Sequence, residues 1–177
     1  TAPHPAGRGA IAAMSAALRR AGLLPEQIDY ISAHGTGTPD NDSMEATAIE
    51  QLFSKQPPPV ASVKRFFGHT LAASGAIKAV LCVQALREQA MPPNLGFESP
   101  DPNLGFEPVT EFRSCSLKHI LSNSFGFGGN NVAIIFSHPD SAGSSGQTLP
   151  PSANATQPQS VSRPAHVSLN RDRKSVV

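Results

Sequence analysis

IDYISAHGTGTP, residues 28–39, is the stretch from which the rest of the chain can be interpreted. Its first six residues predict a short buried strand, because apolar side chains dominate them and a glycine-rich turn follows. His34 comes directly after this strand, and Gly35 and Gly37 leave room for a ligand or a second backbone to approach closely. The stretch therefore predicts a histidine presented at the end of a strand.

Helical patterns surround this strand in the sequence. Apolar residues recur at helical spacing within residues 9–21. A second helix is expected after Asp42, because Asp42 followed three positions later by Glu45 is a capping-box pattern. Residues 60–63 then predict a short strand. Residues 71–89 carry the longest helical pattern, and their nearly all-apolar first turns predict a helix that is buried on most sides.

Two further strands follow, joined by a glycine-rich loop. Residues 120–122 and 132–137 predict the strands, and the stretch NSFGFGGNN at residues 123–131 predicts the loop. Helices alternate with strands along the chain up to this point. That order predicts an α/β fold with a mixed sheet.

Composition divides the chain into two parts. Residues 1–138 carry all the patterned segments and are predicted to form one domain. Residues 139–177 are rich in Ser and Pro, and residues 141–177 contain no aromatic side chain. Such a segment buries too little apolar surface to offset the entropy lost on ordering. We therefore expect a disordered tail, or read-through sequence unrelated to the domain.

Charge and cysteine content exclude several classes of partner. The net charge of the 177 residues is +1, which argues against binding driven by the charge of nucleic acid or an anionic membrane. No apolar run reaches the length of a membrane span. The two cysteines, Cys82 and Cys115, are too few for a disulfide framework and favour a cytoplasmic location.

Three segments carry groups suited to chemistry at strand ends. They are His34, the pair Lys64 and His69 before a helix, and the Phe-Gly-Phe-Gly-Gly loop at residues 125–129. Ligands of α/β sheets gather outside the carboxyl ends of the strands, so these three loops are expected to converge. Two imidazoles and backbone N–H groups suit a carbonyl oxygen that gains negative charge.

Other interpretations of the same residues remain open. A histidine beside glycines often serves only the fold. The glycine-rich loop lacks the Lys-Ser/Thr pair of a phosphate cradle and leads into a strand, so nucleotide binding is disfavoured. His34 and His69 have no Cys or carboxylate at ligand spacing, so no metal is expected. Cys82 lies in an apolar helical pattern and is predicted to pack in the core.

Taken together, the motifs resemble those of the β-ketoacyl-acyl-carrier-protein synthases, across residues 1–137. The likeness is to the bacterial dissociated-type elongation synthases, and modular polyketide synthases share the motifs. The matching segments, in family order, are HGTGT at 34–38 with Asp42 and Glu45, the second histidine motif at 63–76, residues 86–101, and the closing loop at 123–131.

The resemblance implies the C-terminal half of a thiolase-like αβαβα layered fold, in which two similar α/β halves stack, usually as a homodimer. It implies decarboxylative Claisen condensation of malonyl-acyl-carrier protein with an acyl chain held on a cysteine, without a cofactor. The implied partners are acyl-carrier protein and its phosphopantetheine-linked acyl groups. The implied catalytic residues are His34, His69 and Lys64, with Lys64 organising His69. The implied substrate-binding residues are Phe127, whose N–H contributes to an oxyanion hole, with Phe125, Thr36 and Thr38.

Two departures from the family pattern qualify this expectation. The family's nucleophilic cysteine belongs to an N-terminal half that these 177 residues do not include, so we expect no condensation by this chain alone. Lys78 stands where elongation synthases usually carry a glutamate that pairs with the motif lysine. Lys78 then points away, or another carboxylate compensates, or activity has been lost. The alternatives to an active synthase are a non-catalytic partner resembling a chain-length factor and an inactive truncated fragment.

Overall fold

A computed structural model describes residues 3–54, 56–99, 101 and 104–143 of the protein. The helices are α1 (Arg8–Ala21), α2 (Pro39–Phe53), α3 (Lys64–Phe67) and α4 (Ser74–Glu88). The strands are β1 (Tyr30–Ser32), β2 (Val60–Ala61), β3 (Ala90–Met91), β4 (Arg113–Ser114), β5 (His119–Phe125) and β6 (Asn131–Ser137). Short 3-10 turns are η1 (Pro25–Gln27), η2 (Leu71–Ala73), η3 (Phe127–Gly129) and η4 (Pro139–Gly143).

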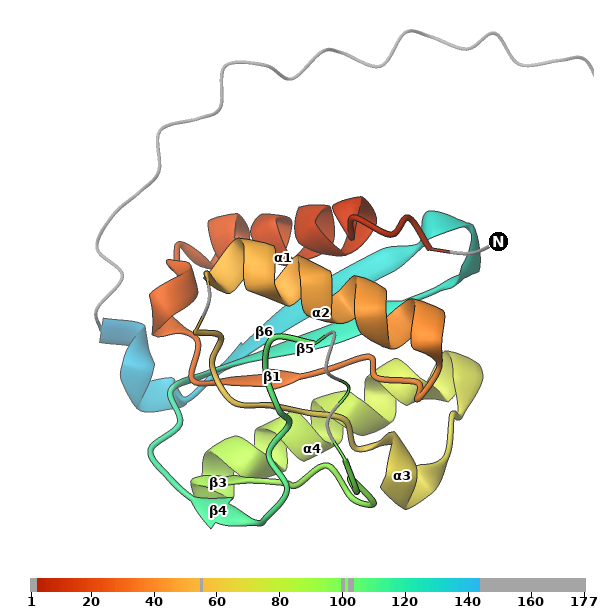
Figure 1. Cartoon of the computed structure of the whole chain (residues 1–177). Helices are drawn as coiled ribbons and strands as arrows, with labels where there is room; N and C mark the ends of the chain where they lie inside the picture. Colours follow the sequence, from red (N-terminus) through yellow and green to blue (C-terminus); the bar gives the residue numbers. More distant parts are fainter. Residues whose placement is uncertain (1–2, 55, 100, 102–103, 144–177) are drawn as a thin grey trace, which may run out of the picture.

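The main sheet has four strands in the order β2-β1-β5-β6. β1 pairs in parallel with β2 and with β5, whereas β5 and β6 are antiparallel. Figure 1 shows α1 and α2 over one face of this sheet and α4 on the other. The predicted α/β fold with a mixed sheet is therefore confirmed.

Alternation along β1 and β5 supplies a separate apolar core to each face of the sheet, because successive side chains of a strand point to opposite sides. Ile31 and Leu121 pack with α1 and α2. Tyr30 and Ile120 pack with α4. All four side chains are almost completely buried, so both faces of the central strands are covered by helices.

The start of α2 differs from the sequence-based expectation. The helix begins at Pro39, with Thr38 as the N-cap, rather than after Asp42. Proline at the first helical position has a backbone angle already suited to a helix, and its missing N–H would be unbonded there in any case. The capping box expected for Asp42 and Glu45 is therefore wrong, and Glu45 lies in the second turn with its side chain buried.

The long helical pattern also differs. Residues 71–73 form the separate turn η2, and α4 begins at Ser74. Its buried residues are Ser74, Lys78, Cys82, Ala85 and Leu86, whereas Val80 and Val83 are 68% and 45% exposed. The expectation of a helix buried on most sides is wrong for the chain by itself: one stripe of α4 is buried and an apolar face is open.

The loop predicted at 123–131 is shorter than expected. β5 continues through Asn123 and Ser124 to Phe125, because the antiparallel pairing with β6 extends as far as Phe125 opposite Asn131. Only residues 126–130 connect the two strands. Asn123 is therefore a completely buried strand residue rather than a loop residue.

The part of the chain after the sheet is described only at its start. Residues 139–143 form η4, so the first residues of the expected tail are ordered. The rest of the predicted tail, 144–177, lies outside the described residues. None of the helices in the described part of the chain is long and apolar enough to cross a membrane.

Candidate active site

Three strand ends meet at one edge of the sheet. β1, β2 and β5 run parallel, so the segments that follow them leave the sheet on the same side. The ring centroids of His34, after β1, and His69, after β2, lie 5.6 Å apart in an edge-to-face arrangement. The ring of Phe125, at the end of β5, lies 5.8 Å from that of His34. The structure thus brings the three predicted segments together.

Hydrogen bonds fix the same tautomer at both histidines. The backbone N–H of Leu71 donates to Nδ1 of His69 at 3.1 Å. The ammonium of Lys64 lies 3.3 Å from Nδ1 of His34, and an ammonium group can only donate. Each Nδ1 is therefore an acceptor, and the neutral ring carries its proton on Nε2. Both histidines have an Nε2–H group left to offer as a donor.

His34 is held in its neutral form. Its side chain is buried, whereas His69 is exposed. Burial, followed by the charges of Lys64 and Lys78 and by His69, lowers the pKa of His34 to about 3. An imidazole in this environment stays uncharged throughout the physiological pH range. It can polarise a carbonyl oxygen without itself being a cation.

The residue that shapes the His34 turn most directly is Glu45, to which we gave no site role from the sequence. Its Oε1 accepts the backbone N–H of His34 and its Oε2 accepts that of Gly35, both at 2.9 Å. Oε1 also accepts Nδ2 of Asn123 at 3.1 Å. The signal in the sequence is a glutamate among the apolar positions of the second helix, which marks Glu45 as unusual without indicating what it contacts.

Lys64 acts on a different histidine from the one implied by the resemblance. Its ammonium contacts Nδ1 of His34 and donates to the carbonyl oxygen of His34. The resemblance implies that it organises His69. The difference arises because Lys64 begins α3 three residues after the end of β2. This strand is the neighbour of β1, so the side chain of Lys64 reaches the end of β1.

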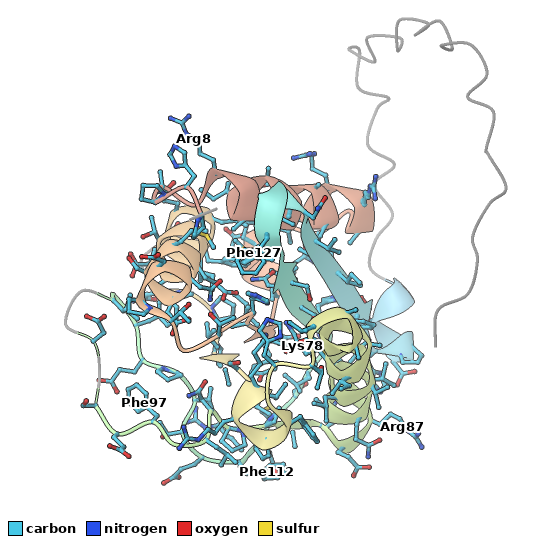
Figure 2. All side chains as sticks on the ribbon, turned by 90° about the vertical axis from the view of Figure 1, so that its right-hand side faces the viewer. Arg8, Lys78, Arg87, Phe97, Phe112 and Phe127 are labelled. Atoms are coloured by element: carbon cyan, nitrogen blue, oxygen red, sulfur yellow. The ribbon has the colours of Figure 1, made fainter. Side chains whose placement is uncertain are left out.

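Lys78 does not point away from the site. It is 2% exposed, and its ammonium donates to the carbonyl oxygens of Ala33, at 2.9 Å, and Asn123. Figure 2 shows Lys78 in the middle of the molecule, while Arg8 and Arg87 extend from its periphery. Burial lowers the pKa of Lys78 to about 8, although the Glu45 carboxylate opposes this shift. Of the three alternatives raised by the sequence, a Lys78 that points away is therefore wrong, and Glu45 is a carboxylate whose charge acts on Lys78.

Gly35 allows the His34 turn to lie against the segment after β2. A Cβ atom at this position would lie 2.5 Å from Cβ of Ser62, and its φ of +38° is in the region that side chains disfavour. Ser62 also donates its hydroxyl to the carbonyl of Gly35 at 2.8 Å. The first glycine of the HGTGT segment is therefore required by this close approach.

The predicted substrate-binding residues lie around the same edge. The hydroxyl oxygens of Thr36 and Thr38 lie 2.8 Å apart. Phe125 is buried beside His34. Phe127 is 84% exposed at the start of η3, so most of its ring is open to solvent in the described structure. The roles of these four residues toward a substrate stay predictions.

The other potentially reactive groups lie apart from this edge or are inert. Cys82 lies on α4 and is buried in the core between this helix and the sheet, as predicted. Burial raises the pKa of its thiol. Burial also raises the pKa of Cys115, which is half-buried. Within the described ranges, no three His, Cys, Asp or Glu side chains gather closely enough to hold a metal ion.

Comparison with known proteins places this arrangement in a family. Residues 1–98 match the model of the beta-ketoacyl synthase, C-terminal domain. The chain is 45% identical over 139 residues to 3-oxoacyl-[acyl-carrier-protein] synthase 2 of Synechocystis sp., covering 77% of this chain and 33% of that protein. It is 40% identical over 142 residues to the mitochondrial 3-oxoacyl-[acyl-carrier-protein] synthase of Arabidopsis thaliana, covering 77% and 31%.

Solved structures agree with the sequence comparison. A ketosynthase in complex with its chain length factor from Xenorhabdus doucetiae is 44% identical, with a TM-score of 0.69, covering 77% of this chain and 35% of that one. The ishigamide ketosynthase/chain length factor is 34% identical, with a TM-score of 0.73 and the same coverage.

The site and the fold together define the C-terminal half of a thiolase-like condensing enzyme fold. The chain belongs to the β-ketoacyl synthase family, of which it carries the C-terminal domain. It spans about a third of the length of the curated relatives that it matches.

Proposed function

We propose that this chain supplies the enolate-stabilising half of a β-ketoacyl synthase, which joins malonyl units to acyl chains in fatty acid or polyketide synthesis. The observation that carries the proposal is the pair His34 and His69. Their rings meet edge to face at 5.6 Å, and both carry their available proton on Nε2. Two such donors suit one thioester oxygen that becomes negatively charged.

The reaction follows from this arrangement. The bond between the α-carbon of the malonyl group and its carboxylate breaks, and carbon dioxide leaves. The electron pair remains as an enolate, whose oxygen accepts hydrogen bonds from His34 and His69. The enolate carbon then attacks the acyl thioester, a carbon–carbon bond forms, and the acyl-carrying thiolate departs. A neutral donor such as His34 suits this step because it stabilises the oxyanion without protonating the carbanion.

The acyl-carrying thiol comes from outside these 177 residues. Cys82 is buried in the core, and the thiols of both Cys82 and Cys115 have raised pKa values, which makes each a poor nucleophile near neutral pH. The proposal therefore requires a second half that brings a reactive cysteine to the open edge beside His34. By itself this chain is expected to be inactive.

Partners and location belong to the same proposal. A type II polyketide acyl-carrier protein occurs in complex with its ketosynthase in one structural relative, which is 30% identical with a TM-score of 0.74. We extend that partnership to this chain, with the phosphopantetheine arm delivering both acyl groups. We also propose a homodimer of the complete enzyme and a cytoplasmic location, the latter supported by two cysteines that are both free.

The experiment is malonyl-acyl-carrier protein decarboxylation by the protein together with its cysteine-bearing half. Replacing either His34 or His69 with Ala should lower the decarboxylation rate by about 10²-fold or more, as expected for loss of one oxyanion donor. His4→Ala, at an exposed position that contacts neither histidine in any hydrogen bond or ring pair of the described structure, is the matched control. A native protein that releases no carbon dioxide, or histidine variants as fast as the control, would overturn the proposal.

A second candidate is a non-catalytic partner that resembles a chain-length factor. Two structural relatives are ketosynthases associated with chain length factors. The observation that favours this candidate is Lys78, which lies at a position where elongation synthases usually carry glutamate. It predicts a stable heterodimer with an active synthase and no decarboxylation that depends on His34. Decarboxylation lost on His34→Ala would exclude it.

A further inference from the structure

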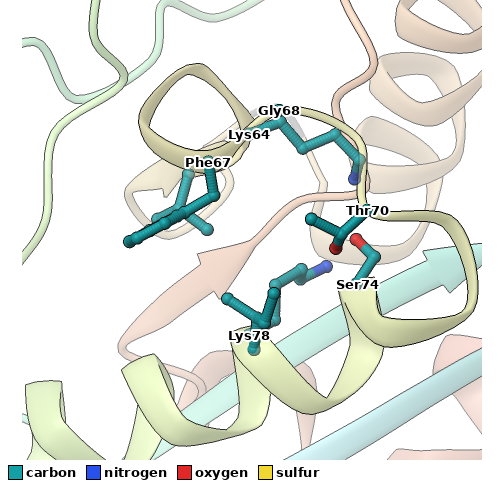
Figure 3. A pocket seen from close by; sticks show the side chains of 8 residues that line it. Lys64, Phe67, Gly68, Thr70, Ser74 and Lys78 are labelled. Atoms are coloured by element: carbon teal, nitrogen blue, oxygen red, sulfur yellow. The ribbon is translucent and has the colours of Figure 1, made fainter.

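The feature that the proposed reaction leaves unexplained is a fully buried lysine with no carboxylate as its direct hydrogen-bond partner in the described structure. Lys78 lies on the sheet-facing side of α4, and its ammonium donates to two carbonyl oxygens. One belongs to Ala33, which follows β1, and the other to Asn123 within β5. Figure 3 shows Lys78 rising from α4 into a small pocket, with Lys64 above it and Thr70 and Ser74 beside it.

We propose that Lys78 is a positioning residue, whose ammonium ties the end of β1 to β5 and thereby fixes the His34 turn against the strand that leads to Phe125. The inference rests on the proposed function, because what Lys78 would position is the enolate-stabilising histidine. It assigns a role to the residue at which this chain departs from the usual family pattern.

The His34 turn is held by charged side chains from three different helices. Lys78 of α4 binds the carbonyl of Ala33. Glu45 of α2 binds the N–H of His34, and Lys64 of α3 binds the carbonyl of His34. Without Lys78, the carbonyl of Ala33 loses its charged donor, and α4 loses its polar bond to the turn.

The two hydrogen bonds of Lys78 reach both sides of the site. β1 and β5 are paired neighbours, with Ser32 opposite Ser122. Ala33 and Asn123 are the next residue along each of the two chain segments. Phe125, two residues after Asn123, has its ring 5.8 Å from that of His34. One ammonium therefore bridges the two strand ends from which His34 and Phe125 project.

Lys78 also changes the electric field at His34. The charged or titratable groups that act on Lys78 are Glu45 from α2, Lys64 from α3 and Cys82 from α4 itself. Those that act on His34 are Lys64, Lys78 and His69. Glu45 and Asp42 from α2 act on these lysines, whereas the formal charges that act on His34 itself are the positive charges of Lys64 and Lys78. These charges oppose protonation of the imidazole and keep Nε2–H as a neutral donor.

A carboxylate could not replace this ammonium directly. The oxygens of Ala33 and Asn123 are acceptors, and the nearby Glu45 is a carboxylate. A glutamate at this position would place a buried negative charge among acceptors, with Lys64 as its nearest source of positive charge. In this chain lysine is therefore the side chain that fits, and the departure at Lys78 does not by itself indicate lost activity.

The test compares Lys78→Met, which keeps the side-chain length without the charge, with the conservative Lys78→Arg. Lys118→Met, at an exposed lysine, is the matched control. In the protein with its cysteine-bearing half, Lys78→Met should lower kcat for malonyl decarboxylation by about 10-fold or more, because small displacements of positioned groups have such effects. KM should stay within about twofold, and Lys78→Arg should recover part of kcat.

A second readout does not depend on catalysis. NMR titration of the His34 ring nitrogens should show its pKa rising by about one unit in Lys78→Met and unchanged in Lys118→Met. If Lys78→Met does not fold, Lys78→Gln, which keeps a donor and loses the charge, should give the same rise. A folded variant with native kcat and an unchanged His34 titration would overturn the inference. A native protein that decarboxylates nothing would remove the proposed function, while the His34 titration would still decide whether Lys78 acts on His34.

Discussion

The carboxylate of Glu45 accepts the backbone N–H groups of His34 and Gly35, each at 2.9 Å, across eleven residues of sequence and from a different element. A buried carboxylate is costly unless its oxygens are bonded and its charge is balanced. Here the two N–H groups and Asn123 supply the bonds, and the charges of Lys64 and Lys78 lie nearby. The position of the catalytic candidate thus depends on a glutamate in the core.

Glu45→Gln should destabilise the protein more than a single lost hydrogen bond would. The amide group presents N–H donors to backbone N–H donors, and the two lysines lose their balancing charge. We expect the free energy of unfolding to fall by about 3 kcal/mol, typical of breaking a buried charge pair. Urea-induced unfolding measures this, with Glu26→Gln at an exposed position as the control that should change little. Equal stabilities of the two variants would contradict the role given to Glu45.

Gly35→Ala and Gly37→Ala form a matched pair within one turn. Both residues have positive φ, but a Cβ at Gly35 meets Ser62 at 2.5 Å, whereas a Cβ at Gly37 has no atom within 4 Å. Gly37→Ala should cost about 1 kcal/mol from backbone strain alone. Gly35→Ala should cost about 2 kcal/mol more, because β1 and the segment after β2 must separate. Thermal or urea unfolding of both variants tests this, and equal losses would show that the contact with Ser62 does not matter.

Sequence reasoning predicted that the three loops converge, but it did not predict which residues hold the His34 turn. Periodicity predicted the strand before His34 and the helices on either side, and parallel strand ends explain why the three loops meet. Those patterns are local in sequence. Glu45 and Lys78 reach the His34 turn through bonds that span 11 and 45 residues, which no local pattern reveals.

The two misjudged helices have physical explanations of different kinds. The capping-box pattern at Asp42 was overridden by Pro39, whose ring already fits the first turn of a helix. The apolar run in α4 does not measure burial, because Val80 and Val83 remain 68% and 45% exposed in the described part of the chain. In a layered fold made of two halves, such residues are expected to pack against a surface that the other half supplies.

The exposed apolar face of α4 is expected to pack against the cysteine-bearing half. Val80→Asp should leave the fold of the chain intact, because Val80 is 68% exposed on the face opposite the buried stripe. It should weaken association with the cysteine-bearing half, because a charge would be buried without a partner at the interface between them. Co-purification of the two halves measures this. Ala12→Asp, at an exposed position on α1, is the control and should not reduce association.

The neutrality of His34 predicts how stability depends on pH. Its pKa is about 3 in the folded protein, below its ordinary value near 6.5, so between these values the unfolded chain binds a proton that the folded protein does not. Stability therefore falls as the pH drops through 6.5, with a contribution of about 1.4 kcal/mol per pH unit from this one group. The pKa of His119 is also lowered, and its effect on stability adds in the same direction.

Urea unfolding between pH 7 and pH 4 should thus show a shallower decline in the free energy of unfolding for His34→Gln than for the native protein. His4→Gln, at an exposed position, should keep the native slope, and a native slope in His34→Gln would show that the histidine is not held neutral.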